Sequence, residues 1–173
     1  MRKRTIKVCS LVLIMLMVMS NVTFANGKEV DNILSSKDVN TSVQPRSLYL
    51  ASGISEVTNQ GEGVLSIYAD FAAYRAVDWA CLTITLERRK GTSGSWTYVK
   101  TYKKEFSSED EGGMLLTGST DFDVYGLTTD YYYRVRCEHK VKTPSGTYET
   151  KNTQTEGVLL TSYPVYRNID EVK

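Results

Sequence analysis

Residues 127–141, LTTDYYYRVRCEHKV, decide the fold of this chain. The stretch holds three consecutive tyrosines, two arginines, one cysteine and the only histidine of the sequence. Tyr133, Val135 and Cys137 occupy alternate positions with the arginines between them, which is the period of a β-strand with one buried face. The stretch therefore predicts a strand whose apolar side enters a core, although its residue types also occur in catalytic sites.

The flanking sequence predicts more strands of the same kind. Residues 79–88 and 96–104 both show strand patterns, and the turn-forming residues 90–95 between them indicate a hairpin. Further strands are expected at residues 64–70, 122–124, 131–142 and 148–160. About seven short strands, with no competing helical period, predict an all-β chain folded as an antiparallel β-sandwich.

The N-terminus predicts export from the cell. Residues 1–25 begin with basic side chains, continue as an apolar run and end on small residues, as a secretory signal peptide does. The alternative is an uncleaved membrane anchor, but the apolar run is short against the roughly 20 residues that span a bilayer. We expect a secreted or cell-surface protein, with membrane contact only through this segment if it stays attached.

Domain boundaries follow from these signals. We expect a signal peptide at residues 1–25, a flexible polar linker at 26–46, the sandwich domain at 47–162 and a C-terminal tail at 163–173.

Charge narrows the range of partners. The chain has 21 basic and 20 acidic residues, and four of the basic ones lie in the expected signal peptide, which leaves 17 against 20 and a net charge of −3. Such a chain lacks the broad positive field that binds phosphate backbones. We expect no nucleic acid as partner, but an unknown extracellular protein or a cell-wall or host glycan.

Residues 122–135 resemble the corner of an immunoglobulin-like or fibronectin type III-like sandwich. In that pattern a leucine is followed six residues later by a tyrosine at the start of the next strand, as Leu127 is by Tyr133 here. The tyrosine bonds back to the corner, and the alternate residues after it enter the core. The resemblance implies a structural role for Leu127 and Tyr133.

Most of the mature chain also resembles small secreted proteins of Gram-positive bacteria that are classed as a domain of unknown function. Beyond the signal peptide and polar spacer, the matching elements are Tyr49-Leu50, Val77-Asp78, Leu86-Glu87-Arg88, Trp96, residues 132–136 and His139. The resemblance implies the same export and architecture, and it brings no assigned activity.

The quoted stretch holds residue types that carry chemistry in other proteins. His139 and Cys137 lie on the same side of the expected strand, and Glu138 lies on the other. A hydrolase needs a nucleophile, a base and an orienting acid within hydrogen-bond reach, and the sequence offers no second catalytic element. One histidine and two distant cysteines match no zinc spacing. We expect structural roles, no enzyme activity and no cofactor, with a small secreted hydrolase as a remote alternative.

The two cysteines of the mature chain are expected to stay unpaired. Leu82 and Ile84 have to face the core, which turns Cys81 outward. Cys137 faces inward by the alternation described above. A disulfide needs Cβ atoms that approach each other, so opposite faces disfavour the bond, and a bulge at residues 80–81 is the alternative that permits it.

Carboxylates in the acidic loop 107–113 and on the strand that follows raise the question of a calcium site. Calcium takes about six to eight oxygens from a constrained loop, and the spacing here matches no such loop. Solvated charges are the expected state. The side chains concerned are Glu109, Asp110, Glu111, Asp121 and Asp123.

Trp79, Trp96 and Tyr98 are the candidates for ligand contact, because exposed aromatic rings stack on sugars in carbohydrate-binding sandwiches. In the competing interpretation, which we favour, the tryptophans cover the ends of the core. The outward strand positions predict a mixed-charge face with a cross-strand pair between Glu87 and an arginine; they are Thr83, Thr85, Glu87, Arg134, Arg136 and Glu138. The resulting hypothesis is an exported, non-catalytic interaction module, with a carbohydrate-binding module as the alternative.

Overall fold

The computed structural model describes residues 35–40 and 47–165, and within these ranges the chain is all-β. The described ranges contain nine strands: β1 (Ser35–Asn40), β2 (Leu50–Gly61), β3 (Val64–Val77), β4 (Trp79–Arg89), β5 (Thr97–Ser107), β6 (Leu115–Val124), β7 (Tyr132–Lys142), β8 (Tyr148–Thr155) and β9 (Val158–Leu159). No helix in these ranges is long and apolar enough to cross a membrane. The expected signal peptide lies outside them.

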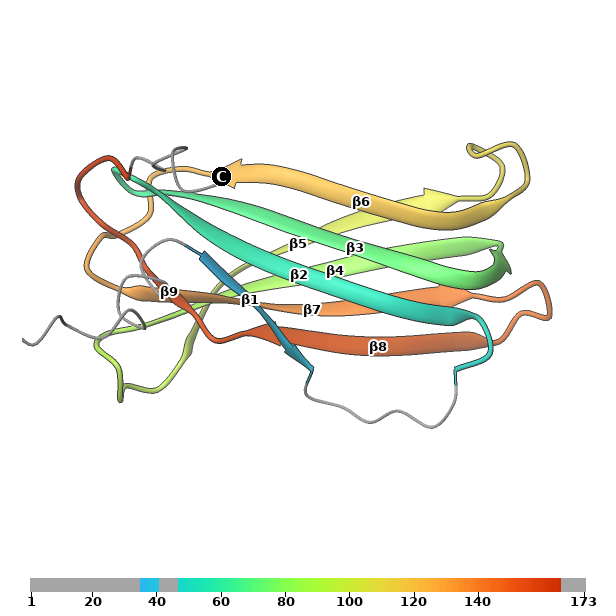
Figure 1. Cartoon of the computed structure of the whole chain (residues 1–173), viewed down its shortest axis with the longest axis horizontal. Helices are drawn as coiled ribbons and strands as arrows, with labels where there is room; N and C mark the ends of the chain where they lie inside the picture. The colour runs from blue at the N-terminus through green and yellow to red at the C-terminus, as the bar shows by residue number, and fades with distance from the viewer. Residues whose placement is uncertain (1–34, 41–46, 166–173) are drawn as a thin grey trace, which may run out of the picture. The chain divides into compact units, whose positions relative to one another are not determined.

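The strands form two antiparallel sheets that pack as a sandwich, which confirms the fold class expected from the sequence. In one sheet β3 pairs with β2 on one side and β6 on the other. In the other sheet the order is β5-β4-β7-β8, and β9 pairs with the start of β7. β7 lies between β4 and β8 (Figure 1). The expected hairpin is confirmed as β4 and β5.

A single core lies between the sheets, built from alternate residues of each strand. Its members include Leu65, Ile67 and Phe71 on β3, Leu82, Ile84 and Leu86 on β4, and Tyr133 and Val135 on β7. Burying each such apolar side chain stabilises the fold by about 1.5–3 kcal/mol relative to exposure. Aromatic contacts close the core toward β5, where the Phe71 and Phe106 rings are 5.5 Å apart.

Tyr133 forms the corner bond that the resemblance implied. Its hydroxyl donates a hydrogen bond of 2.9 Å to the carbonyl oxygen of Thr128, five residues upstream. The Leu127 N–H donates to the Gly63 carbonyl oxygen at 3.0 Å, which ties the corner to the turn between β2 and β3. These two bonds set the position at which β7 enters the sheet.

A seam of buried polar side chains lies along β2, β7 and β8, where the two sheets meet, and ends just after β9. Its members are Ser55, Asn59, His139, Thr153, Thr155 and Thr161, all almost fully buried. The hydroxyl groups of Ser55 and Thr153 share a hydrogen bond of 2.8 Å, and Thr155 Oγ1 accepts one from the Val135 N–H at 3.0 Å. Each of these polar groups therefore finds a partner inside the protein, as buried polar groups require.

Two expectations about strand boundaries are corrected. β1 forms within residues 26–46, so the prediction of a flexible linker is wrong for residues 35–40. β1 pairs first with β2 and then with β8, so it connects the two sheets (Figure 1). The single strand expected at residues 148–160 is divided into β8 and β9, because Gly157 has φ +115° and interrupts the extended backbone.

We expect Tyr133→Phe to lower the free energy of unfolding by about 1–2 kcal/mol, because it removes the corner hydrogen bond and leaves the Thr128 carbonyl without its donor. Tyr125→Phe is the matched control, since the Tyr125 hydroxyl also bonds, to Asp123, but the side chain is 71% exposed. Urea denaturation measures both variants. Equal effects of the two substitutions would contradict a special role for the corner bond.

Candidate functional site

His139 is buried in the seam and unavailable to a substrate. Its side chain has no exposed surface, and Nε2 lies 2.8 Å from Thr153 Oγ1. Gly53 on β2 packs directly against the ring, since a Cβ at that position would lie 2.4 Å from His139 Cγ. Burial lowers the pKa of His139 to about 4, although the backbone of Asp70 favours the protonated ring. The imidazole is therefore neutral at physiological pH.

Cys137 lies beside His139 and is equally enclosed. Its Sγ is 3.9 Å from His139 Nδ1, but burial raises the pKa of the thiol to about 12. A reactive cysteine needs a lowered pKa and access, and Cys137 has neither. The two side chains that the sequence suggested as a nucleophile and base are brought together, but inside the core.

Cys81 and Cys137 are both free. Cys81 pairs across the sheet with Lys140, whereas Cys137 pairs with Ile84, so the thiols lie at different levels as well as on opposite faces. Cys81 is buried, with 6% exposure, even though it alternates with the outward Thr83 and Thr85. The direction expected for Cys81 is confirmed, but neighbouring side chains cover it.

We call the face of the sheet β5-β4-β7-β8 that points away from the core the outer face. It carries most of the polar and charged side chains that could contact a ligand. It is built from successive cross-strand pairs of β4 and β7, two residues or roughly 7 Å apart along the strands. In order these pairs are Arg89–Tyr132, Glu87–Arg134, Thr85–Arg136, Thr83–Glu138, Cys81–Lys140 and Trp79–Lys142. β8 adds Gln154, Asn152, Thr150 and Tyr148 beside them, by the same register.

One end of the outer face holds a cluster of stacked arginines, the arginine cluster, made of Arg89, Trp96, Tyr132, Arg134 and Glu87. The guanidinium carbons of Arg89 and Arg134 each lie 4.4 Å from the centre of the Trp96 ring, and Arg89 also lies 5.7 Å from that of Tyr132. Arg134 Nε bonds to Glu87 Oε2 at 2.7 Å, the cross-strand pair that the sequence predicted. The cluster therefore fixes its guanidinium planes by stacking and by one carboxylate.

Arg89, unlike Arg134, has no carboxylate partner in the part of the chain that the structure describes. No ion pair forms on its guanidinium in the described residues, and its buried Nε has no hydrogen-bond acceptor. Buried polar atoms without a partner are rare in folded proteins. Arg89 therefore has hydrogen-bonding capacity that the described part of the chain leaves unused.

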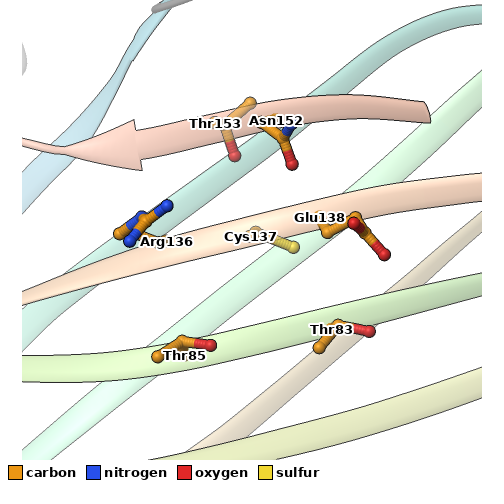
Figure 2. A pocket seen from close by; sticks show the side chains of 7 residues that line it. All are labelled: Thr83, Thr85, Arg136, Cys137, Glu138, Asn152 and Thr153. Carbon is orange, nitrogen blue, oxygen red and sulfur yellow. The ribbon is translucent and has the colours of Figure 1, made fainter. Parts of the chain in front are cut away.

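A polar hollow of about 260 Å³ adjoins the arginine cluster on the outer face. Figure 2 shows its lining on three neighbouring strands: the outward Thr83 and Thr85 on β4, Arg136 and Glu138 on β7 and Asn152 on β8, together with the almost fully buried Cys137 on β7 and Thr153 on β8. Arg136 is 60% exposed and lies 3.6 Å from Glu87, which connects the hollow to the cluster. The hollow is smaller than the roughly 300–1,000 Å³ of pockets for drug-sized ligands, and it offers polar contacts above all.

On the opposite face of the sandwich, the paired positions of β2, β3 and β6 carry negative charge. These positions present carboxylates and neutral residues only, with Glu56, Tyr68 and Asp121 side by side. The hydrogen bond to Asp70, then burial, then the charges of Asp70, Asp121 and Glu56 raise the pKa of Tyr68. The two outer faces are therefore electrostatically distinct, although the net charge of the chain is close to zero.

The aromatic candidates do not form one surface. Trp79 packs edge-on against Tyr148 at one end of β4, whereas Trp96 stacks on Arg89 at the other end. A strand rise of roughly 3.3 Å per residue puts these ends about 30 Å apart. Tyr98, 66% exposed, pairs with Glu87 near Trp96. Neither tryptophan packs on the core, so the interpretation that they cover its ends is wrong.

The acidic side chains proposed for calcium are divided between two places. Glu109, Asp110 and Glu111 lie in the loop after β5, whereas Asp121 and Asp123 lie on β6. Across residues 35–40 and 47–165 no group of three or more histidine, cysteine, aspartate or glutamate side chains is placed to hold a metal ion.

Sequence reasoning found the outward residues of β4 and β7 but missed Arg89, Tyr132 and Asn152. The contribution of Asn152 depends on the register between β7 and β8, which a local pattern does not give. Tyr132 alternates with the outward Arg134 and Arg136, so the local pattern of β7 predicts its direction.

Comparison with known proteins gives no family for the chain. No protein-family model matches it, and no curated protein matches it.

We expect acid to destabilise the protein through His139. Its pKa is lowered on folding, so the unfolded chain binds the proton first, and stability that is complete above pH 6.5 is lost as pH falls toward 4. Between pH 7 and 5 the loss should be about 2 kcal/mol. Urea denaturation at each pH measures it. His139→Gln should start less stable but lack this slope, and an unchanged slope would assign it to other groups.

We expect Cys137 to resist thiol reagents as long as the protein is folded. In a Cys9→Ser, Cys81→Ser background, where it is the only thiol, modification by a disulfide reagent should proceed only as fast as the protein opens, because the thiol is 1% exposed. Fast labelling in native buffer, compared with a Cys137→Ser blank, would show that the core admits solvent there.

Proposed function

We propose that this chain is an exported, non-catalytic module of the immunoglobulin-like or fibronectin type III-like class, which binds an extracellular partner through its outer face. Support for the class comes from the strand order, in which β2-β3-β6 face β5-β4-β7-β8, and from the corner bond of Tyr133. Its kinship with small secreted proteins of Gram-positive bacteria is part of the proposal, and so is export.

The observation that carries the proposal is the segregation of charge between the two outer faces. Around the hollow, Arg89, Arg134 and Arg136 point outward from β4 and β7, whereas the positions at which β2, β3 and β6 pair hold carboxylates and no cation. Glu87 and Glu138 share the outer face, so its charge is predominantly and not wholly positive. A predominantly positive face attracts anionic partners and orients them before contact. The polar hollow lies within this cationic surface, where an approaching partner would be held.

A carbohydrate-binding module that stacks neutral sugars on Trp79, Trp96 and Tyr98 is the second candidate. Tyr98 supports it, because this ring is exposed beside Glu87, at the end of the face that holds the arginine cluster. Against it, the Trp96 ring already has two guanidinium groups stacked on it, and Trp79 lies at the far end of β4. A single sugar chain would have to displace the arginines to use Trp96.

The test is retention of the purified protein on intact Gram-positive cells and on isolated cell walls. We expect Lys103→Glu/Arg136→Glu, which reverses two exposed charges on the outer face, to lower retention at least tenfold. Asp121→Lys/Asp123→Lys makes a matched reversal of two exposed charges on the other face and should retain binding. Equal retention of both variants, or none by the wild type, would contradict the proposal. Circular dichroism checks that both variants fold.

A further inference from the structure

We propose that the ligand of the outer face is an acidic polysaccharide: the arginine cluster binds the acidic group of one sugar, and the polar hollow binds the hydroxyl groups of the adjoining part of the chain. This inference rests on the proposed function and names the ligand class of the same face. It follows from the order of the cross-strand pairs, from the unused donors and from the composition of the hollow.

The cluster and the hollow form one continuous track. Arg89 and Tyr132 are followed along the strands by Glu87 and Arg134, then by the lining of the hollow that begins at Thr85 and Arg136. Successive pairs are roughly 7 Å apart, so the track offers alternating contacts to a linear ligand and not to a compact one. A polymer laid along β7 would meet the cluster first and the hollow next.

The cluster carries guanidinium charge that carboxylates in the described ranges only partly balance. Arg89 stacks on Trp96 and has no carboxylate partner in these ranges, so its charge is fixed in place and uncompensated, although its Nε is buried. Arg136 is 60% exposed and lies 3.6 Å from Glu87, a looser pairing than the 2.7 Å contact of Arg134. Guanidinium groups held in this way bind carboxylate, sulfate and phosphate through paired hydrogen bonds.

The composition of the hollow favours an acidic sugar chain over polyanions that contain no sugar hydroxyl groups. Thr83, Thr85 and Asn152 both donate and accept hydrogen bonds, as sugar hydroxyl groups do. Glu138 accepts hydrogen bonds from hydroxyl groups but repels a phosphate placed beside it. A chain with a charge on every unit, such as a nucleic acid or polyphosphate, would bring negative charge against Glu138. An acidic sugar chain can direct a hydroxyl group there instead.

The probes for the experiment share one backbone: dextran sulfate, carboxymethyl-dextran, dextran phosphate and unmodified dextran, with inorganic polyphosphate as the polyanion that lacks sugar. Full-length protein is titrated at low salt, and binding is measured by calorimetry. A Trp79→Phe background leaves Trp96 as the only tryptophan, so its fluorescence reports on the cluster itself. We expect at least one acidic dextran to bind and to change this fluorescence, and unmodified dextran to do neither.

Matched variants distinguish a site from general charge attraction. Arg136→Gln should weaken the acidic dextran about tenfold, whereas Lys142→Gln, which removes the same charge farther along β7, should change it less than twofold. Arg89→Lys keeps the charge but loses the planar donor group, and it should weaken binding as Arg136→Gln does. Asn152→Ala should weaken the acidic dextran and leave any polyphosphate binding unchanged.

Four results would overturn the inference: equal effects of Arg136→Gln and Lys142→Gln, polyphosphate binding as tight as that of the best dextran, binding of unmodified dextran alone, or no binding of any dextran. If no dextran binds while cell retention still depends on the outer face, only the ligand class is wrong. If substitutions on the outer face also leave retention on cells unchanged, the proposed function is wrong as well.

Discussion

The constraint on which the structure depends is the burial of alternate side chains from two sheets in one interior. In a strand with this pattern, the direction of the remaining side chains is also fixed, because every position between two buried ones points to solvent. On β7 the pattern places Tyr133, Val135 and Cys137 inside and sends Arg134 and Arg136 outside. The same alternation that builds the core therefore also composes the outer face.

Where the sheets meet, this apolar core gives way to the polar seam. Ser55 and Thr153 bond to each other, and Thr153 also contacts His139, so each polar group satisfies the next. The chain approaches closely enough for this only because Gly53 has no side chain to collide with the imidazole. His139 is thus a structural residue that burial keeps uncharged, and as a consequence the stability of the fold is sensitive to acid.

Much of this arrangement could be predicted from the sequence, and the limit of prediction has a physical cause. Local alternation identified the strands, the hairpin and the corner at Tyr133, since each depends on residues close in the chain. β1 was missed, because the polar residues 35–40 carry no strand signal and gain their partners from β2 and β8. Arg89 was missed for a related reason: its stacking on Trp96 depends on how the chain folds back after residues 90–95.

Net charge was the least informative quantity, and the register explains why. The net charge predicts the electrostatic field at the surface only when positive and negative side chains are evenly distributed. Here the antiparallel pairing places most of the cations on one face and carboxylates on the other. Tyr68 pairs with Glu56 and Asp121 on one side of the sandwich, while β4 and β7 place Arg134 and Arg136 on the other. A shift of one residue in the pairing of β7 would turn these arginines into the core, which their charge forbids. The electrostatic character of the outer face is consequently protected by the same energy that holds the core together, and it persists as long as the fold does.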